Sequence, residues 1–490
     1  MLAILLILLV IVLFVFNTTS KPRNLPPGPK PVYPLIGNLP AVAGKDVLLT
    51  FREMRKKYGD IYSLYFGHQL MIVVNGYETI KNVLVKHGAL FSERPHNFLS
   101  DEMCQGRGLI FSTGKVWKEH RRFSTLAFQE LGFGKLSFEE AINTEVVKVL
   151  EFLEEKQECP VDIKECIFAS ITNIMLKIIM GKSYNYDDTS FNEFLKKMVE
   201  TSQLVGNASI LVNCFPFLRY CPFDPLKKNV AIENRDKITS FFKDTYKEHC
   251  QTYNREYIRD FVDLYIREME KIAEEGNSEE MLTAVIGDLF GAGGETSTTA
   301  VCWAFIYLVR HPEIQARIRE EVDSTVGPTK IPSYSERHKM PFLEATILEV
   351  LRLGDVVPLA IPHGVPNSVV FDGYTIPKDS SILINLDSIS HDPSLFDNPT
   401  QFKPERFLDS SGTVIHVTEF IPFSIGRRRC IGSAVARMEL FIFITAVLSK
   451  FELLPPEGQP PPDPVGVLGI TNMPRPFQLR AMFRRNSSES

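Results

Sequence analysis

The sequence predicts a mainly α-helical fold with small β-sheets (α+β), built as one large domain. Apolar residues recur at three-to-four spacing through much of the chain, whereas alternating runs are few and short. A length of 490 residues, without an internal repeat or a second proline-rich linker before residue 455, favours one body. Because the net charge is −5, there is no global basic field, and no nucleic-acid partner is expected.

Residues 1–20 are predicted to be a transmembrane anchor. Residues 1–16 are apolar without exception, and at about 1.5 Å per residue they form a short but workable span. The alternative is a cleaved signal peptide, but no basic residue precedes the run and no A-x-A-like site follows it. Lys21, Arg23 and Lys30 come directly afterwards, so the positive-inside rule keeps the rest of the chain cytoplasmic.

Residues 21–44 are predicted to be a linker, and residues 45–490 the main domain. Seven prolines between positions 22 and 40 favour an extended, semi-rigid spacer between membrane and domain. The clearest elements expected in the domain are helices over 45–58, 136–157 and 433–450, strands over 61–66 and 69–75, and short strands within 369–386.

The longest predicted helix runs from Ser278 to Arg310, with Asn277 and Glu280 as a capping box. Four glycines, each costing about 1 kcal/mol relative to alanine, interrupt its apolar centre: Gly287, Gly291, Gly293 and Gly294. They indicate that something packs closely against this helix. A transmembrane dimer face is the alternative, but Asp288 and Glu295 inside the span argue against lipid.

Cys430 is the strongest candidate for chemistry. It lies in the run FSIGRRRCIG, just before the helix over 433–450, which is expected to be amphipathic. A helix start and the arginines at 427–429 favour a thiolate, and Gly426 and Gly432 let backbone amides and a flat cofactor approach the sulfur. A single cysteine is more often a structural hydrophobe, but these neighbours point instead to a sulfur that holds a metal, beside cations for an acidic cofactor.

FSIGRRRCIG resembles the F-x-x-G-x-R-x-C-x-G signature of the cytochrome P-450 superfamily, the haem-thiolate monooxygenases. Further motifs resemble that family in order and spacing: WKEHR at Trp117–Arg121, AGGET at Ala292–Thr296, EVLR at Glu349–Arg352 and PERF at Pro404–Phe407. The anchor, PPGP and the stretch PFLEATILEVLRL are most similar to the microsomal family-two members. The resemblance implies a single helix-rich haem-thiolate domain on the cytoplasmic side of the endoplasmic reticulum membrane.

The resemblance also implies a role for each matching residue. Cys430 becomes the axial ligand of haem b, iron protoporphyrin IX, and Thr296 and Glu295 the catalytic pair that handles dioxygen and protons. Contacts to the haem are implied for Trp117, Arg121, Ala292, His363, Phe423, Gly426, Arg428 and Gly432. Glu349, Arg352 and Arg406 form a structural charge cluster that supports the loop carrying the cysteine. Gly294 and Ser433 depart from the family pattern, which leaves the water network around the dioxygen and one local contact open.

The expected activity is insertion of one oxygen atom from O2 into an apolar substrate, a fatty acid, steroid or xenobiotic. NADPH acts only indirectly, through a flavoprotein reductase, and a b-type cytochrome is a further candidate partner. Basic residues around WKEHR and the signature are expected to dock the reductase. Two other functions stay open: a peroxide-rearranging isomerase or dehydratase, and a non-enzymatic haem carrier. Pocket positions are expected at Phe111, 200–220, Phe290, 356–361 and Ile470.

Overall fold

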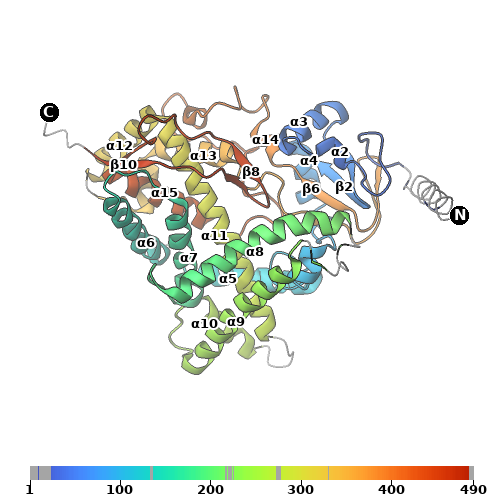
Figure 1. Ribbon diagram of the computed structural model, residues 1–490, viewed down its shortest axis with the longest axis horizontal. Coiled ribbons are helices and arrows are strands. Elements are labelled where there is room, and N and C mark those ends of the chain that lie inside the picture. Colours follow the sequence, from blue (N-terminus) through green and yellow to red (C-terminus); the bar gives the residue numbers. More distant parts are fainter. Residues whose placement is uncertain are drawn as a thin grey trace.

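Helices make up most of the described chain and confirm the predicted mainly α fold with small sheets (Figure 1). The computed structural model describes residues 9, 22, 24–132, 136–215, 218, 223, 224, 226–271, 278–328 and 330–484.

The α-helices are α2 (Leu39–Val42), α3 (Val47–Tyr58), α4 (Tyr77–Lys81), α5 (Gly114–Glu130), α6 (Leu136–Glu155), α7 (Lys164–Met180), α8 (Thr189–Cys214), α9 (Lys228–Thr252), α10 (Phe261–Lys271), α11 (Ser278–Arg310), α12 (Pro312–Val326), α13 (Pro341–Gly354), α14 (Asp387–Ser390) and α15 (Ser433–Lys450). Short π and 3-10 turns are η1 (Asn82–Lys86), η2 (Leu99–Met103), η4 (Tyr334–Lys339) and η5 (Pro404–Phe407). The strands are β1 (Ile61–Phe66), β2 (Gln69–Val74), β3 (His363–Gly364), β4 (Val369–Phe371), β5 (Tyr374–Ile376), β6 (Ser381–Ile384), β7 (Phe451–Leu454), β8 (Gly466–Leu468), β9 (Asn472–Pro474) and β10 (Arg480–Phe483).

The largest sheet has the strand order β1-β2-β6-β3 and lies beside α2, α3 and α4 (Figure 1). β1 and β2 form the predicted hairpin, with Phe66 opposite Gln69 at the turn. Gly67 is required there, because its φ is +61° and an added Cβ would lie 2.1 Å from the carbonyl oxygen of Cys214. The hairpin turn thereby packs tightly against the end of α8. β6 pairs in parallel with β2, so it joins segments far apart in sequence.

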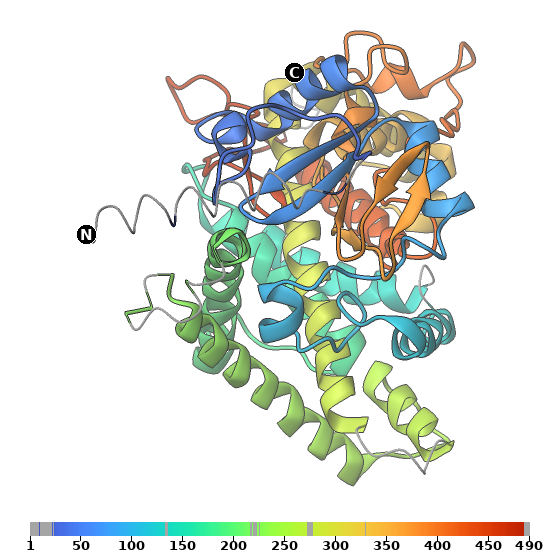
Figure 2. The same ribbon diagram turned by 90° about the vertical axis from the view of Figure 1, so that its right-hand side faces the viewer.

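α11 runs through the middle of the molecule and packs against α7, α9, α13 and α15 (Figure 2). Its bounds agree with the predicted helix, although Asn277 of the expected capping box lies outside the described residues. The expected amphipathic character of the helix over 433–450 is wrong. Apolar residues cover all sides of α15, which is buried along most of its length because it crosses the main core beside α11.

Of the predicted anchor over 1–20, all residues but Leu9 lie outside the described part of the chain. Within the described residues, no helix combines the length and the apolar character that crossing a bilayer requires. The proline-rich segment is pinned to the domain from Asn24 onward. The Ser63 N–H donates to the Pro27 carbonyl at 2.8 Å, and the Thr375 N–H donates to the Asn24 carbonyl at 2.8 Å. The part of the expected linker from Asn24 onward is therefore held against strands β1 and β5, which belong to two different sheets.

Candidate functional site

A cavity of about 2390 Å³ with a mainly apolar lining lies against the central part of α11. Phe111, Ile361 and Ile470 line it, as the sequence predicts. Phe290 does not line it; its ring stacks on Phe242 of α9, with centroids 5.3 Å apart, and its side chain is buried. The expectation of an apolar lining is also too simple. Around α8, polar side chains face the cavity: Glu200, Thr201, Ser202, Gln203 and Asn213.

Cys430 lies in the loop that leads into α15, and it lines this cavity. Its backbone N–H donates to the Phe423 carbonyl at 3.0 Å, which closes the loop. Burial raises the pKa of the Cys430 thiol, although the backbone N–H groups of Gly432 and Ser433 and the charge of Arg121 act to lower it. The predicted helix-start effect is present, but burial outweighs it. A metal bound to the sulfur would reverse this balance, because a coordinated thiol loses its proton.

The two signature glycines have different roles. Gly426 has a φ of +78°, and an added Cβ would lie 2.3 Å from the Leu84 carbonyl oxygen. The turn and the packing on η1 therefore require a glycine at this position, and its predicted place beside the cofactor stays a prediction. At Gly432, the nearest atom to an added Cβ is Sγ of Cys430, at 4.0 Å. The missing side chain there leaves room beside the sulfur.

The middle of α11 opens onto the cavity. Gly291 and Ala292 are exposed although they lie in the central helix of the molecule, and nothing lies within 4 Å of a Cβ added at Gly291. Gly293 serves packing instead, since its added Cβ would lie 2.8 Å from Cε of Met175 on α7. The Thr296 hydroxyl donates to the Ala292 carbonyl at 2.5 Å. Only part of the glycine run therefore clears space for a bound group.

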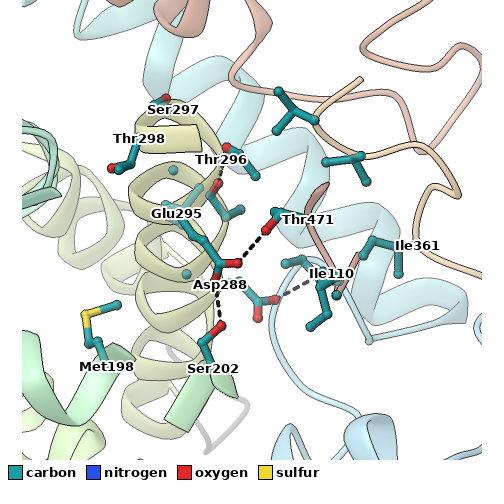
Figure 3. A pocket seen from close by; sticks show the side chains of 18 of the residues that line it. Ile110, Met198, Ser202, Asp288, Glu295, Thr296, Ser297, Thr298, Ile361 and Thr471 are labelled. Carbon is teal, nitrogen blue, oxygen red and sulfur yellow. Dashed lines mark hydrogen bonds between the residues drawn. The ribbon is translucent and has the colours of Figure 1, made fainter. Parts of the chain in front are cut away.

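Glu295 reaches from α11 into the cavity, where two hydroxyls bind its carboxylate (Figure 3). Ser202 of α8 donates to one carboxylate oxygen at 2.5 Å, and Thr471, between β8 and β9, donates to the other at 2.6 Å. The predicted catalytic acid is thus held between two elements that the sequence did not connect to it.

Donor groups from several elements gather near Cys430. The Arg428 guanidinium donates to backbone carbonyls between residues 92 and 112, at distances of 2.6 to 3.3 Å. Its Cζ atom lies 3.8 Å from the centre of the Trp117 ring. Trp117 Nε1 is buried and has no hydrogen-bond partner among the described residues. Arg121, on the same helix α5, donates to the Arg429 carbonyl.

His363 joins this group from β3. Its Nδ1 lies 2.6 Å from the Phe91 carbonyl, so the neutral ring carries its proton on Nδ1 and presents Nε2 as an acceptor. Burial, together with the charges of Arg94 and Arg428, lowers the pKa of His363 to about 3. Burial also lowers the pKa of Arg94 to about 10 and that of Arg428 to about 8. In the described chain, no carboxylate forms an ion pair with either arginine.

These features fit the haem that the sequence predicts. Two carboxylates of a bound group would supply the negative charge missing near Arg94 and Arg428, and an acceptor for the orphaned Trp117 N–H. The Cys430 sulfur supplies a soft metal ligand, and Gly432 and Gly291 leave space for a flat molecule.

The structure brings the predicted charge cluster together behind the cavity. Arg352 forms a fork with Glu349, Nε to Oε2 at 2.7 Å and Nη2 to Oε1 at 2.8 Å. Arg406 of η5 donates from Nε to Oε1 of Glu349 at 3.0 Å. Arg352 also donates to the carbonyls of Ser390 and Pro399, both at 2.7 Å. This buried network holds α13 against the chain that leads toward Cys430.

Three cavity residues carry no role in the sequence-based interpretation. Arg94 lies in an irregular segment that carries no periodic signal. Asp288 accepts the N–H groups of Leu109 and Ile110 at 2.6 and 2.7 Å, and burial raises its pKa to about 7. Burial also raises the pKa of Glu439 to about 7, while the nearby Ser297 hydroxyl acts to lower it. The signal for Glu439 was available, because it is the one acid in the apolar stretch over 438–448.

Comparison with known proteins agrees with this site. Residues 26–481 match the family described as Cytochrome P450. The chain is 35% identical to Cytochrome P450 2U1 of Homo sapiens, over 94% of this chain and 89% of that protein. It is 35% identical to Cytochrome P450 2C3 of Oryctolagus cuniculus, over 96% of both chains. It is 34% identical to Cytochrome P450 2C8 of Homo sapiens, over 95% of both chains. The chain therefore belongs to the cytochrome P450 family, the monooxygenases that act on organic substrates with a thiolate-ligated haem b.

Proposed function

We propose that this protein inserts one atom of O2 into an apolar substrate, with electrons that NADPH supplies through a separate flavoprotein reductase. The observation that carries the proposal is that the Cys430 sulfur and the Gly291–Thr296 stretch of α11 line one large, mainly apolar cavity. When bound, thiolate-ligated haem supplies the activation of dioxygen. Cys430 would hold its iron, and Trp117, Arg94 and Arg428 would bind its carboxylates.

The remaining site residues bind substrate or move protons. Thr296 holds its hydroxyl proton on the Ala292 carbonyl, which leaves the oxygen lone pairs available as acceptors. Glu295 of α11 and Glu439 of α15 are two of the carboxyl groups that line the cavity, and they are the candidates to pass protons inward. The apolar lining favours a fatty acid, a steroid or a xenobiotic over a charged metabolite.

The reductase is proposed to dock on the exposed basic face around α5. Lys118, Arg122 and Arg427 line a shallow depression of about 450 Å³ beside Trp117 and Arg121. Such a face attracts an acidic partner and gives an association rate that falls with salt. A b-type cytochrome is a second candidate for the same face.

The domain organisation follows from this proposal. Residues 1–20 anchor the chain in the endoplasmic reticulum membrane, 21–44 lead to the domain, and 45–490 carry out catalysis on the cytoplasmic side. Similarity to Cytochrome P450 2U1 and 2C8 supports the assignment as far as the family reaches.

The test is turnover of purified holoprotein with a lipid and drug panel, screened first by spectral titration. Product that requires both NADPH and reductase supports the monooxygenase, whereas product formed from a peroxide substrate without them indicates the isomerase or dehydratase. Cys430→Ser should abolish the red-shifted band of the reduced carbon monoxide complex. A band that survives this substitution would contradict the proposed ligand.

A further inference from the structure

Glu295 is the meeting point of three parts of the cavity wall. Its two carboxylate oxygens accept from Ser202, 93 residues earlier in the chain, and from Thr471, 176 residues later. All three side chains line the cavity, and Figure 3 shows the two hydroxyls approaching the carboxylate from different elements. In a mainly apolar surrounding, two short hydrogen bonds hold a carboxylate strongly, because losing them would leave the carboxylate without a hydrogen-bond partner.

The two hydroxyl groups that bind Glu295 lie on segments that are held in place to different degrees. The β8–β9 turn is fixed independently of Thr471, because the Asn472 N–H donates to the Val356 carbonyl at 2.8 Å and the Asn472 carbonyl accepts from Trp303 Nε1 at 2.8 Å. α8 instead packs mainly against α9, not against α11. The Ser202 hydroxyl therefore ties the helix above the cavity to a carboxylate whose other oxygen is fixed on a stable turn.

We propose that Ser202 and Thr471 are positioning residues that use Glu295 as a latch, which closes α8 over the cavity. Widening the cavity between α8 and α11 breaks the Ser202–Glu295 bond and frees one carboxylate oxygen. Loss of Thr471 leaves the carboxylate free to turn away from Ser202. Ligand entry is thus coupled to the release of the acid that lies next to Thr296. Only the coupling to proton transfer rests on the proposed function. The effect of the latch on ligand entry does not depend on it.

The experiment uses the full-length haem-loaded protein and 4-phenylimidazole, an apolar ligand that changes the haem spectrum on binding. Stopped-flow mixing gives its association and dissociation rates for wild type, Ser202→Ala and Thr471→Val. A hydrogen bond to a charged acceptor is worth about 1.5–3 kcal/mol, so each variant should raise both rates by about 10- to 100-fold. The ratio of the two rates, and so the Kd, should stay nearly constant, because the latch changes the barrier and not the end states.

Matched variants separate a latch from general loosening of the fold. Thr471→Ser keeps the hydroxyl and should restore wild-type rates. Thr299→Val removes a neighbouring α11 hydroxyl that donates only to the Glu295 carbonyl, at 2.8 Å, and should leave both rates unchanged. Wild-type rates in Ser202→Ala and Thr471→Val would overturn the latch. A change in only one of the two rates, which would change the Kd as well, would also overturn it. The proposed monooxygenase fails separately, if wild type binds the ligand but forms no product with reductase and NADPH.

Discussion

The charge cluster of Glu349, Arg352 and Arg406 and the arginine-lined end of the cavity are both buried and polar. They differ in whether their charges find ion-pair partners within the protein. In the cluster, Glu349 lies between Arg352 and Arg406, so the charges are paired inside the protein. At the cavity, Arg94 and Arg428 donate only to backbone carbonyls. The protein completes the first region by itself. In the second, Asp288 and Glu93 act on the arginines only from a distance, and a bound acidic group would supply both a direct ion pair and an acceptor for the Trp117 N–H.

The difference separates residues that build the scaffold from residues that bind the cofactor. Ion pairs closed within the chain should control the free energy of unfolding. Donors without partners should control how long the cofactor stays bound, with little effect on the empty protein. Substitutions in the two regions therefore should move different measurements.

The largest effect is expected from Arg352→Ala. This change leaves the buried Glu349 with only Arg406 and the Lys403 N–H as partners among the described residues, and it strips donors from the Ser390 and Pro399 carbonyls. Breaking a buried pair typically costs about 3–5 kcal/mol, so we expect a loss of that size in the free energy of unfolding, measured by urea denaturation. Arg352→Lys should recover only part of it, because an ammonium does not reproduce the fork. Equal stability of Arg352→Lys and wild type would show that charge alone suffices here.

The two tryptophans of the chain offer a matched pair for the second effect. Trp303 Nε1 donates to the Asn472 carbonyl at 2.8 Å, whereas Trp117 Nε1 has no acceptor in the part of the chain that the structure describes. Trp303→Phe should cost about 1–3 kcal/mol of unfolding free energy, because it leaves the Asn472 carbonyl unsatisfied. Trp117→Phe keeps a ring beneath Arg428 and breaks no bond, so stability of the haem-free protein should change by less than about 0.5 kcal/mol.

The rate of haem loss should change in Trp117→Phe and not in Trp303→Phe. A hydrogen bond to a charged acceptor is worth about 1.5–3 kcal/mol, so Trp117→Phe should speed haem loss by about 10- to 100-fold. Transfer of haem to an excess of apomyoglobin measures this rate. Trp303→Phe, the control, should leave it unchanged. Identical haem-loss rates in the two variants would remove Trp117 from the cofactor site.

The sequence predicted the fold class, the long central helix and the first hairpin, because these depend on local periodicity and turn residues. It also grouped Glu349 with Arg352, three residues apart on one helix face. What it missed depends on distant contacts. Gly426 packs on the Leu84 carbonyl, and Ser202 meets Glu295 only after α8 crosses the cavity. The sequence of α15 shows apolar residues on all sides of the helix. An amphipathic helix was nevertheless expected, because the sequence does not show that other helices cover every side of it.

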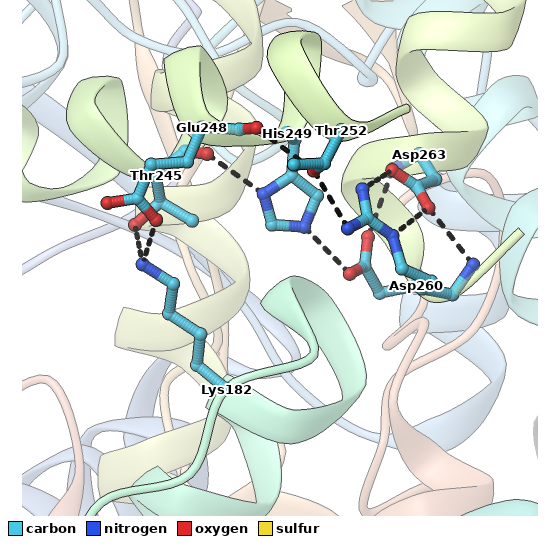
Figure 4. Close-up of polar contacts among 8 residues, drawn as sticks. Lys182, Thr245, Glu248, His249, Thr252, Asp260 and Asp263 are labelled. Atoms are coloured by element: carbon cyan, nitrogen blue, oxygen red, sulfur yellow. Dashed lines mark hydrogen bonds and ion pairs between the residues drawn. The ribbon is translucent and has the colours of Figure 1, made fainter. Parts of the chain in front are cut away.

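The smallest effects are expected from two buried histidines, one beside a carboxylate and the other beside arginines. His249 of α9 lies 2.8 Å from the carboxylate of Asp260, in a cluster that Arg259 and Asp263 complete (Figure 4). Burial lowers the pKa of His249, but the hydrogen bond and charge of Asp260 outweigh it, so the net pKa is raised. Burial lowers the pKa of His363 to about 3, and the charges of Arg94 and Arg428 act in the same direction.

The two shifts give opposite slopes of stability against pH. The folded state holds the His249 proton more tightly than the unfolded state, so that stabilisation is complete below about pH 6.5 and is lost as the pH rises through the folded pKa. For His363 the unfolded state takes up the proton first, so stability falls as the pH drops from about 6.5 toward 3. Urea denaturation of the haem-free protein between pH 5 and 9 checks both signs. His249→Gln should flatten the decline on the alkaline side, and His363→Gln the decline on the acid side. If His363→Gln leaves the acid side unchanged, neither burial nor the cavity arginines lower the pKa of this ring, and the contrast between the paired and unpaired regions no longer extends to their histidines.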